Sequence, residues 1–264
     1  MANRPSVRAQ KVWPVERSGA LILVVALLIT LNISQTVWAE ARKLVQQSDR
    51  PWQAIGRVNM ADGGYCTGTL VAPKLVLTAA HCLWDRRLNR RASMTRLYFA
   101  AGYQRGDVLA SARVVGIVTP PVTGTPDRGD APHNPGDDWA LLKLDRDLSD
   151  RIEPLPVLAL DAATLLTLIK QRAGFLQAGY RFDRAHALMV NHDCEVRAID
   201  PARHILLHKC AVVAGDSGGP ILAHLNGRYS VIAVQTAQTA GTEPGYGIAI
   251  PGATFGDLIF PKKP

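Results

Sequence analysis

The chain has 264 residues, of which 47% are apolar and 20% are charged, so it can bury a core of ordinary size in one or two domains. Its net charge is +8, but four basic residues and one glutamate among the first 39 residues account for +3 of this and leave +5 for the rest. That remainder contains no dense run of Lys and Arg, which argues against nucleic-acid binding.

The amino-terminal segment predicts export. A cationic stretch leads into the apolar run ALILVVALLITLNI, Ala20 to Ile33, which is shorter than the roughly 20 residues that a bilayer span needs and typical of a signal-peptide core. Val37 and Ala39 place small residues before a cleavage site after Ala39. An uncleaved membrane anchor over residues 1–39 remains the alternative. Both interpretations place residues 40–264, taken as one domain, outside the cytoplasm (secreted or periplasmic), where disulfides can form.

Short strands dominate the rest of the chain, and their regular spacing between turns predicts an all-β sandwich or barrel. Ala162–Arg172 alone has the apolar spacing of a helix. Thr119–Asp138 is rich in Pro and Gly and is expected to be a loop. The predicted strands are Ala54–Asn59, Gly64–Ala72, Leu75–Ala79, Arg96–Ala101, Ala110–Val118, Trp139–Leu144, Ala187–Val190, Ile205–His208, Ser230–Thr236 and Tyr246–Ile250.

Two polar residues lie at the ends of apolar runs. His81 follows VLTAA and precedes Cys82, which can close back on Cys66 and restrain the histidine. Asp138 stands directly before the apolar run WALL, where a carboxylate needs a partner because an unpaired buried charge costs several kcal/mol. Each residue taken alone is also compatible with a purely structural role.

The segment VVAGDSGGPI, residues 212–221, places three glycines around Asp216 and Ser217. One glycine usually suffices for a turn, so three indicate a backbone that comes close to another group. Serine becomes a nucleophile when an imidazole takes its proton, and that imidazole needs a carboxylate to fix its tautomer. The backbone N–H groups of Gly215 and Ser217 could then stabilise an oxyanion. His81, Asp138 and Ser217 together supply all three groups.

These three motifs, LTAAHC, DDWALL and GDSGGP, resemble those of the chymotrypsin/trypsin-like serine peptidases, in particular an exported bacterial branch. The resemblance covers roughly residues 50 to 256 and is weak between about 150 and 190. It implies two six-stranded antiparallel β-barrels with the active site in the cleft between them. It also implies that His81 is the general base and acid, that Asp138 orients it, that Ser217 is the nucleophile, and that Gly215 and Ser217 form the oxyanion hole. CTGTLVAPKLVLTAAHC matches the family's first disulfide loop, which pairs Cys66 with Cys82.

The acid before the nucleophile, Asp216, lacks its usual partner in this sequence. The family supplies a new Ile-Val-Gly-Gly amino terminus, and no such segment occurs here. We expect an internal cation, such as an Arg from the middle of the chain, so that activity needs no proteolytic activation. Cleavage after Lys43, which would free Leu44, is the alternative.

The resemblance places the substrate pocket at Ala211, which corresponds to its floor, and along Val234, Gln235 and Thr236, which correspond to its wall. Because Ala211 is not acidic, the usual preference for Arg or Lys is not expected. We expect a small or medium side chain at the cleaved position, with an acidic or other polar one as the alternative.

The second cysteine pair admits two interpretations. His192 with Cys194 and His208 with Cys210 could place four zinc-type ligands on one face of two strands. A disulfide between Cys194 and Cys210 suits an exported chain better and is our expectation.

The function expected is therefore that of an exported serine endopeptidase, a monomer acting on polypeptides with neither a cofactor nor a metal. The main rival is a peptidase-like scaffold without turnover. An esterase is a weaker rival, because its G-x-S-x-G elbow and its alternation of strands and helices are missing.

Overall fold

The computed structural model describes residues 42–61, 63–85, 88, 90–120, 134–239 and 245–260. The predicted export segment, residues 1–39, lies outside them, as does most of the predicted loop before Asp138. Among the residues described, no helix is long and apolar enough to cross a membrane.

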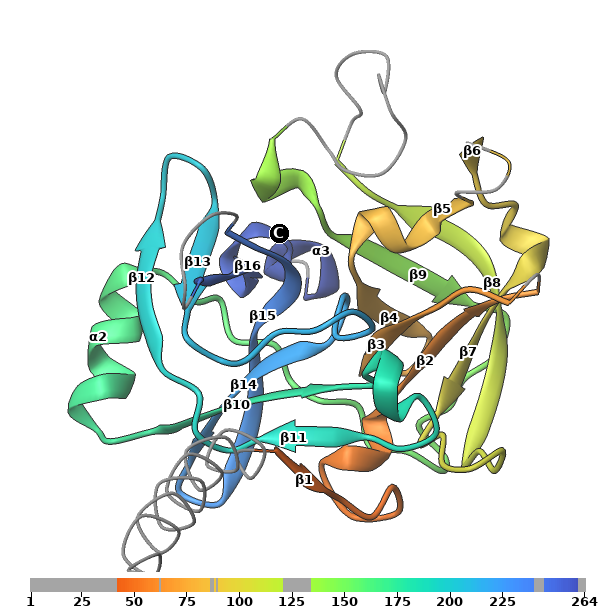
Figure 1. Ribbon diagram of the computed structural model, residues 1–264, viewed down its shortest axis with the longest axis horizontal. Coiled ribbons are helices and arrows are strands. Elements are labelled where there is room, and N and C mark those ends of the chain that lie inside the picture. The colour runs from red at the N-terminus through yellow and green to blue at the C-terminus, as the bar shows by residue number, and fades with distance from the viewer. Residues whose placement is uncertain are drawn as a thin grey trace, which may run out of the picture. The chain divides into compact units, whose positions relative to one another are not determined.

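The first part of the fold is a closed antiparallel barrel with the strand order β2-β3-β4-β9-β8-β7 (Figure 1). Its inward-facing side chains are apolar, and Leu70, Val76, Leu142 and Phe99 are completely buried. The strands are Ile55–Met60 (β2), Tyr65–Ala72 (β3), Leu75–Thr78 (β4), Leu97–Ala101 (β7), Ala110–Val118 (β8) and Ala140–Leu144 (β9).

The second part is an antiparallel sheet with the strand order β1-β11-β10-β14-β15-β16-β13-β12. The expectation of an all-β fold in two antiparallel parts is confirmed, although this part has eight strands where six were expected. Its strands are Arg42–Leu44 (β1), Gly174–Gly179 (β10), Met189–Asn191 (β11), Val196–Asp200 (β12), Ile205–His208 (β13), Pro220–Leu225 (β14), Arg228–Gln238 (β15) and Gly247–Pro251 (β16).

Helices occupy little of the described chain. The predicted helix is observed as α2, Ala162–Lys170, where the Asp161 side chain accepts from the Thr164 amide at 2.7 Å as an N-cap. It ends before Arg172, which takes a left-handed conformation while the Ala173 amide bonds back to the Leu168 carbonyl. The remaining short elements are the α-helix α3, Gly256–Ile259, the strand pair β5, Trp84–Asp85, with β6, Arg90–Arg91, and the 3₁₀ turns η1, Trp52–Ala54, η2, Ala80–Leu83, η3, Met94–Arg96, η4, Pro135–Asp137, η5, Phe182–Arg184, and η6, Gly252–Thr254.

Each predicted strand overlaps an observed one, whereas β1, β5, β6, β10, β12 and β14 were not predicted. One apolar cluster runs from barrel residues such as Leu70 to Val231 and Ile250 of the second sheet. The two sheets therefore share a core, and the connections that lie where they meet have fixed supports on both sides.

Candidate active site

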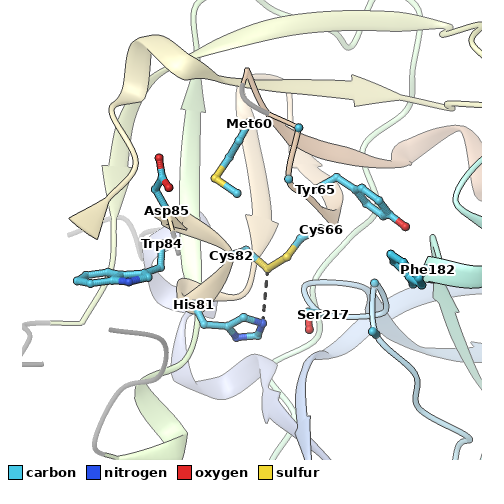
Figure 2. Close-up of a pocket in the computed structure, with 13 residues that line it drawn as sticks. Met60, Tyr65, Cys66, His81, Cys82, Trp84, Asp85, Phe182 and Ser217 are labelled. Atoms are coloured by element: carbon cyan, nitrogen blue, oxygen red, sulfur yellow. Dashed lines mark hydrogen bonds between the residues drawn. A yellow bond between two sulfur atoms is a disulfide. The ribbon is translucent and has the colours of Figure 1, made fainter. Parts of the chain in front are cut away.

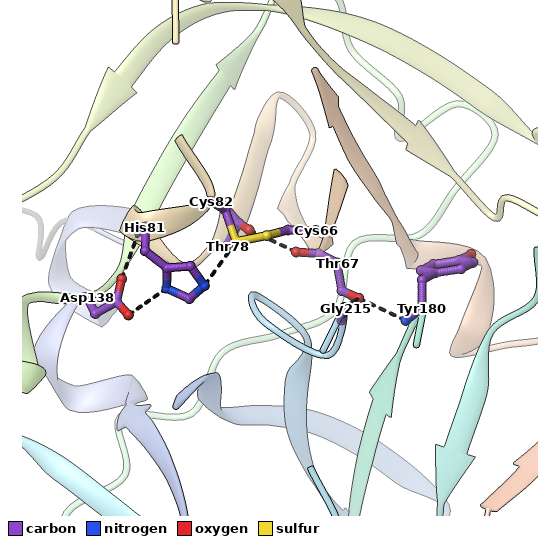
Figure 3. Close-up of a disulfide and its surroundings, with 8 residues drawn as sticks. All are labelled: Cys66, Thr67, Thr78, His81, Cys82, Asp138, Tyr180 and Gly215. Carbon is purple, nitrogen blue, oxygen red and sulfur yellow. Dashed lines mark hydrogen bonds and ion pairs between the residues drawn. A yellow bond between two sulfur atoms is a disulfide. The ribbon is translucent and has the colours of Figure 1, made fainter. Parts of the chain in front are cut away.

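His81 is held at the end of β4 by the turn η2 and by a disulfide. Cys82, inside that turn, bonds to Cys66 of β3, which confirms the first expected pairing. Both polar atoms of His81 that face Asp138 are engaged: Nδ1 lies 2.7 Å from Oδ2, and the backbone amide donates to Oδ1 at 2.9 Å (Figure 3). This double contact requires a proton on Nδ1, so Nε2 is left available to accept one.

Asp138 is buried, and its neighbours fix its position. It follows η4, in which Pro135 is the first residue and the Asn134 side chain accepts from the Gly136 amide at 3.2 Å. The next residue, Trp139, packs its ring against Phe255 with 5.7 Å between the ring centroids. The carboxylate bonded to His81 is thus that of Asp138, as the sequence pattern indicated, and not that of the adjacent Asp137.

Ser217 lies in the connection between β13 and β14, and its carbonyl accepts from the Thr67 amide of the barrel at 2.9 Å. It lines the same cavity of about 490 Å³ as His81 and Gly215 (Figure 2). Among the described residues no hydrogen bond joins His81 Nε2 to the Ser217 hydroxyl, and Nε2 lies 3.8 Å from the Cys82 sulfur. In enzymes that use such a pair, the hydrogen bond is often long before substrate binds.

The amides of Gly215 and Ser217 meet no protein acceptor within the described part of the chain. The carbonyl of each preceding peptide is anchored elsewhere: that of Ala214 accepts from Phe182 at 2.7 Å, and that of Asp216 accepts from Gly219 at 2.9 Å. The C=O and N–H of a trans peptide point in opposite directions. Each N–H therefore points away from the residue that holds the carbonyl of its own peptide, and it is available to a ligand.

Two glycines of this loop are explained by their backbone conformation and by their close neighbours. Gly215 has φ +94°, and an added Cβ would lie 2.2 Å from the Tyr180 carbonyl oxygen. Gly218 has φ +79°, and its Cβ would lie 2.2 Å from the Thr67 carbonyl oxygen. Each combines a left-handed backbone with a close approach to another chain segment, so no other residue fits either position.

Asp216 is completely buried and is paired with Arg42 of β1. The guanidinium donates from Nη1 to Oδ1 at 3.0 Å and from Nη2 to Oδ2 at 2.8 Å, and the Val213 amide donates to Oδ2 at 2.9 Å. This is the bidentate geometry in which Arg binds a carboxylate most strongly. The cation is internal, as expected, but it comes from the first strand of the domain and not from the middle of the chain.

The residues expected to form the substrate pocket do not line the cavity described above. Ala211 is exposed, whereas Val234, Gln235 and Thr236 are buried in β15. Gln235 acts instead as a structural bridge: its amide group donates to the Ala237 carbonyl at 2.7 Å, and its Oε1 lies 2.6 Å from His208 Nε2.

His208 is completely buried beside Gln235. From the sequence it was considered only as a zinc-type ligand. Its Nδ1 accepts from the Cys210 amide at 3.2 Å, so the ring is neutral with the proton on Nε2. Burial lowers its pKa from 6.5 to about 4, opposed by the Gln235 hydrogen bond and by Asp216, while Arg42 adds to the lowering.

The second cysteine pair forms the expected disulfide between Cys194 and Cys210. The zinc alternative is wrong for the described structure, because both sulfurs are bonded to each other and His208 is occupied by Gln235 and Cys210. The sulfurs of Cys66 and Cys82 lie close to His81, but they too are joined and offer no thiolate to a metal.

Comparisons with known proteins identify the fold and the family. The structure is similar to a solved Glu endopeptidase in complex with MPD, with a TM-score of 0.64 and 19% identity over 83% of this chain and 94% of that one, so the fold is chymotrypsin-like. The model of the trypsin family matches residues 42–259. The chain therefore belongs to the trypsin family of serine peptidases. No curated protein matches the sequence.

Replacing Arg42 with Ala should destabilise the fold by about 3–5 kcal/mol, because it leaves the Asp216 carboxylate buried and unpaired. Chemical unfolding measures this effect, and the rate at which Ser217 reacts with a fluorophosphonate probe measures the accompanying loss of site geometry. Combining Arg42→Met with Asp216→Asn removes both charges and should recover most of the stability.

Lys43→Gln is the matched control, since Lys43 is an exposed cation on the same strand. It should leave stability and reactivity unchanged. Loss of reactivity in this variant alone would point to cleavage after Lys43, and not to Arg42, as the source of the partner of Asp216.

The free energy of unfolding should fall by about 3 kcal/mol as pH drops from 6.5 to 4 on account of His208, because a pKa of about 4 in the folded chain lets the unfolded chain bind the proton first. Urea unfolding at half-unit pH intervals measures this slope. His208→Gln should flatten it, whereas His192→Gln should change it little, since His192 is far more exposed. An unchanged slope in His208→Gln would contradict the assignment.

Proposed function

We propose that this chain is an exported serine endopeptidase that hydrolyses peptide bonds through an acyl-enzyme. The observation that carries the proposal is the arrangement at one cavity, where the imidazole fixed by Asp138 and the Ser217 hydroxyl face the same space as the uncommitted amides. Membership of the trypsin family supports the same reaction class.

In the first step the Ser217 oxygen attacks the carbonyl carbon of the substrate, its proton passes to His81 Nε2, and the carbonyl electrons move onto oxygen. The ionised Asp138 stabilises the imidazolium through the Nδ1 contact and does not itself take the proton. The resulting oxyanion accepts from the Gly215 and Ser217 amides, and one such donor is worth about 10²–10³ in rate.

In the second step His81 returns the proton to the leaving amine, the C–N bond breaks, and the acyl group remains on Ser217 as an ester. A water molecule then attacks this ester while His81 takes its proton, and the serine oxygen leaves with a proton from His81. Atoms and charges balance over the cycle, and neither a metal nor a cofactor is needed.

The location we propose is outside the cytoplasm, secreted or periplasmic, after cleavage behind Ala39. Two disulfides in the described domain suit an oxidising compartment. Retention of residues 1–39 as an inner-membrane anchor is the alternative, and we propose a monomeric enzyme in either case.

For the side chain at the cleaved position we propose a small or medium residue. The support is the family resemblance, which assigns Ala211, a residue without a carboxylate, to the pocket floor, although Ala211 does not line the cavity of His81 and Ser217. The name of the Glu endopeptidase whose fold the chain shares keeps an acidic residue as the alternative.

A fluorophosphonate probe should label the wild-type protein and not the Ser217→Ala variant, because only an activated serine displaces the fluoride. Peptide hydrolysis should fall by about 10⁴-fold or more in Ser217→Ala, since the whole triad acts as a unit. Mass spectrometry of the labelled peptide identifies the site. A wild-type protein that folds but takes no label would favour the scaffold alternative.

Cleavage of a mixed peptide library should show small or medium residues before the scissile bond, with Arg and Lys disfavoured by about 10-fold or more for want of a pocket carboxylate. Ala211→Asp supplies the missing acid and should raise the share of Arg and Lys. Strong cleavage after Arg or Lys by the wild-type enzyme would refute the assignment of the pocket floor.

A further inference from the structure

We propose that Thr67 is a positioning residue of the oxyanion hole, whose hydroxyl holds the backbone of Gly215 in the conformation that presents its N–H. The inference rests on the proposed function for the reaction that the hole serves. Thr67 lies in β3 of the barrel, outside the three motifs and outside the cavity lining.

The Thr67 hydroxyl joins two segments of the second part of the fold. It donates to the Gly215 carbonyl at 2.8 Å and accepts from the Tyr180 amide at 2.9 Å, and Figure 3 shows the three residues close together. Thr67 is completely buried. Its own backbone is fixed as well, since its carbonyl accepts from the Thr78 hydroxyl at 2.8 Å and its amide donates to Ser217.

Gly215 needs such an external restraint because a glycine backbone can rotate through conformations that side chains forbid elsewhere. Its preceding peptide is anchored by the Phe182 amide on the Ala214 carbonyl, and its following peptide by the Thr67 hydroxyl on its own carbonyl. With both peptide planes fixed, φ and ψ of Gly215 are determined. Its N–H belongs to the first of these planes, and the Thr67 contact keeps the second from rotating relative to it.

Thr67 acts on the first anchor too, through Tyr180. The Tyr180 amide bonds to the Thr67 hydroxyl, and its phenol donates to the Tyr103 carbonyl at 2.9 Å, so this buried residue is tied to the barrel at both ends. Phe182, which holds the Ala214 carbonyl, is only two residues further along. One hydroxyl therefore supports both hydrogen bonds that define the Gly215 conformation.

Neighbouring contacts limit the expected effect of losing this hydroxyl. Tyr65 donates its phenol to the Arg181 carbonyl at 3.3 Å, and Arg57 donates to the Ala185 carbonyl at 3.3 Å. The segment that carries Phe182 stays attached to the barrel without Thr67. The second anchor, the hydrogen bond to the Gly215 carbonyl, is lost with the Thr67 hydroxyl.

The test replaces Thr67 with Val, which has nearly the same shape but no hydroxyl, and normalises rates to sites counted by fluorophosphonate titration. We expect kcat and the phosphonylation rate to fall by about 10–100-fold with KM changed by less than about twofold, because only oxyanion stabilisation is impaired. Affinity for a peptidyl trifluoromethyl ketone, whose adduct places an oxyanion in the hole, should fall by the same factor. Affinity for a product peptide should not.

Two variants of the same strand complete the design. Thr67→Ser retains the hydroxyl and should recover at least about half of kcat, a rescue expected if the hydrogen bonds matter more than the methyl group. Thr69→Val is the matched control, because Thr69 is equally buried and its hydroxyl has no partner among the described residues. It should react like the wild-type chain.

Equal phosphonylation rates in the wild-type chain and Thr67→Val would overturn the inference, as would an equal loss in Thr69→Val. A uniform fall in affinity for both the ketone and the product peptide would also overturn it, since that indicates general loosening. A wild-type chain that is phosphonylated but cleaves no peptide would contradict the proposed function only. The inference about Thr67 would then be decided by the phosphonylation rates of the wild-type chain and Thr67→Val. A wild-type chain that takes no label would overturn both.

Discussion

The buried pair of Arg42 and Asp216 is the constraint on which the site depends. A carboxylate with no exposed surface must find a counter-charge, and this one is adjacent to Ser217. Its partner lies 174 residues away in the sequence and is positioned by the pairing of β1 with β11. The loop that carries Ser217 can therefore reach its described geometry only when this edge of the second sheet has formed. Formation of this edge and ordering of the loop that carries Ser217 are therefore linked through one buried ion pair.

The site also depends on contacts that cross from one part of the fold to the other. Thr67 lies in β3 of the barrel and His81 in the turn that follows β4, whereas Gly215 and Ser217 lie in the connection between β13 and β14 of the second sheet. Two contacts of Thr67 with the loop join these halves directly, through the amide to Ser217 and the hydroxyl to Gly215. Hydrogen bonds of this kind orient backbone dipoles before substrate arrives, so little reorganisation is left for the reaction itself. A loop rich in glycine becomes rigid through its partners and not through its own side chains.

The sequence predicts those parts of the site that are local in the chain. Strong strand patterns locate most of the barrel, and three short motifs locate His81, Asp138 and Ser217. It also predicts that Asp216 needs an internal cation, since burial of charge has a known cost, but no local pattern selects Arg42 among the basic residues. Thr67 lies in the segment that resembles the family's first disulfide loop, but nothing local marks it, because its proposed role depends on contacts with residues 113 and 148 positions away. The strands missed in the second sheet, such as β10 with two glycines, have weak patterns and form through their neighbours.

The two buried acids of the site, Asp138 and Asp216, have partners that differ in whether they can lose a proton. Asp138 is bonded to an imidazole, whose proton must come and go during the proposed reaction. Asp216 is bonded to a guanidinium, which stays charged at any pH at which proteins remain folded. An α-amino group in the same position would titrate near pH 8 and release the acid in alkaline solution. Arg42 therefore gives the loop that carries Ser217 a support that does not depend on protonation.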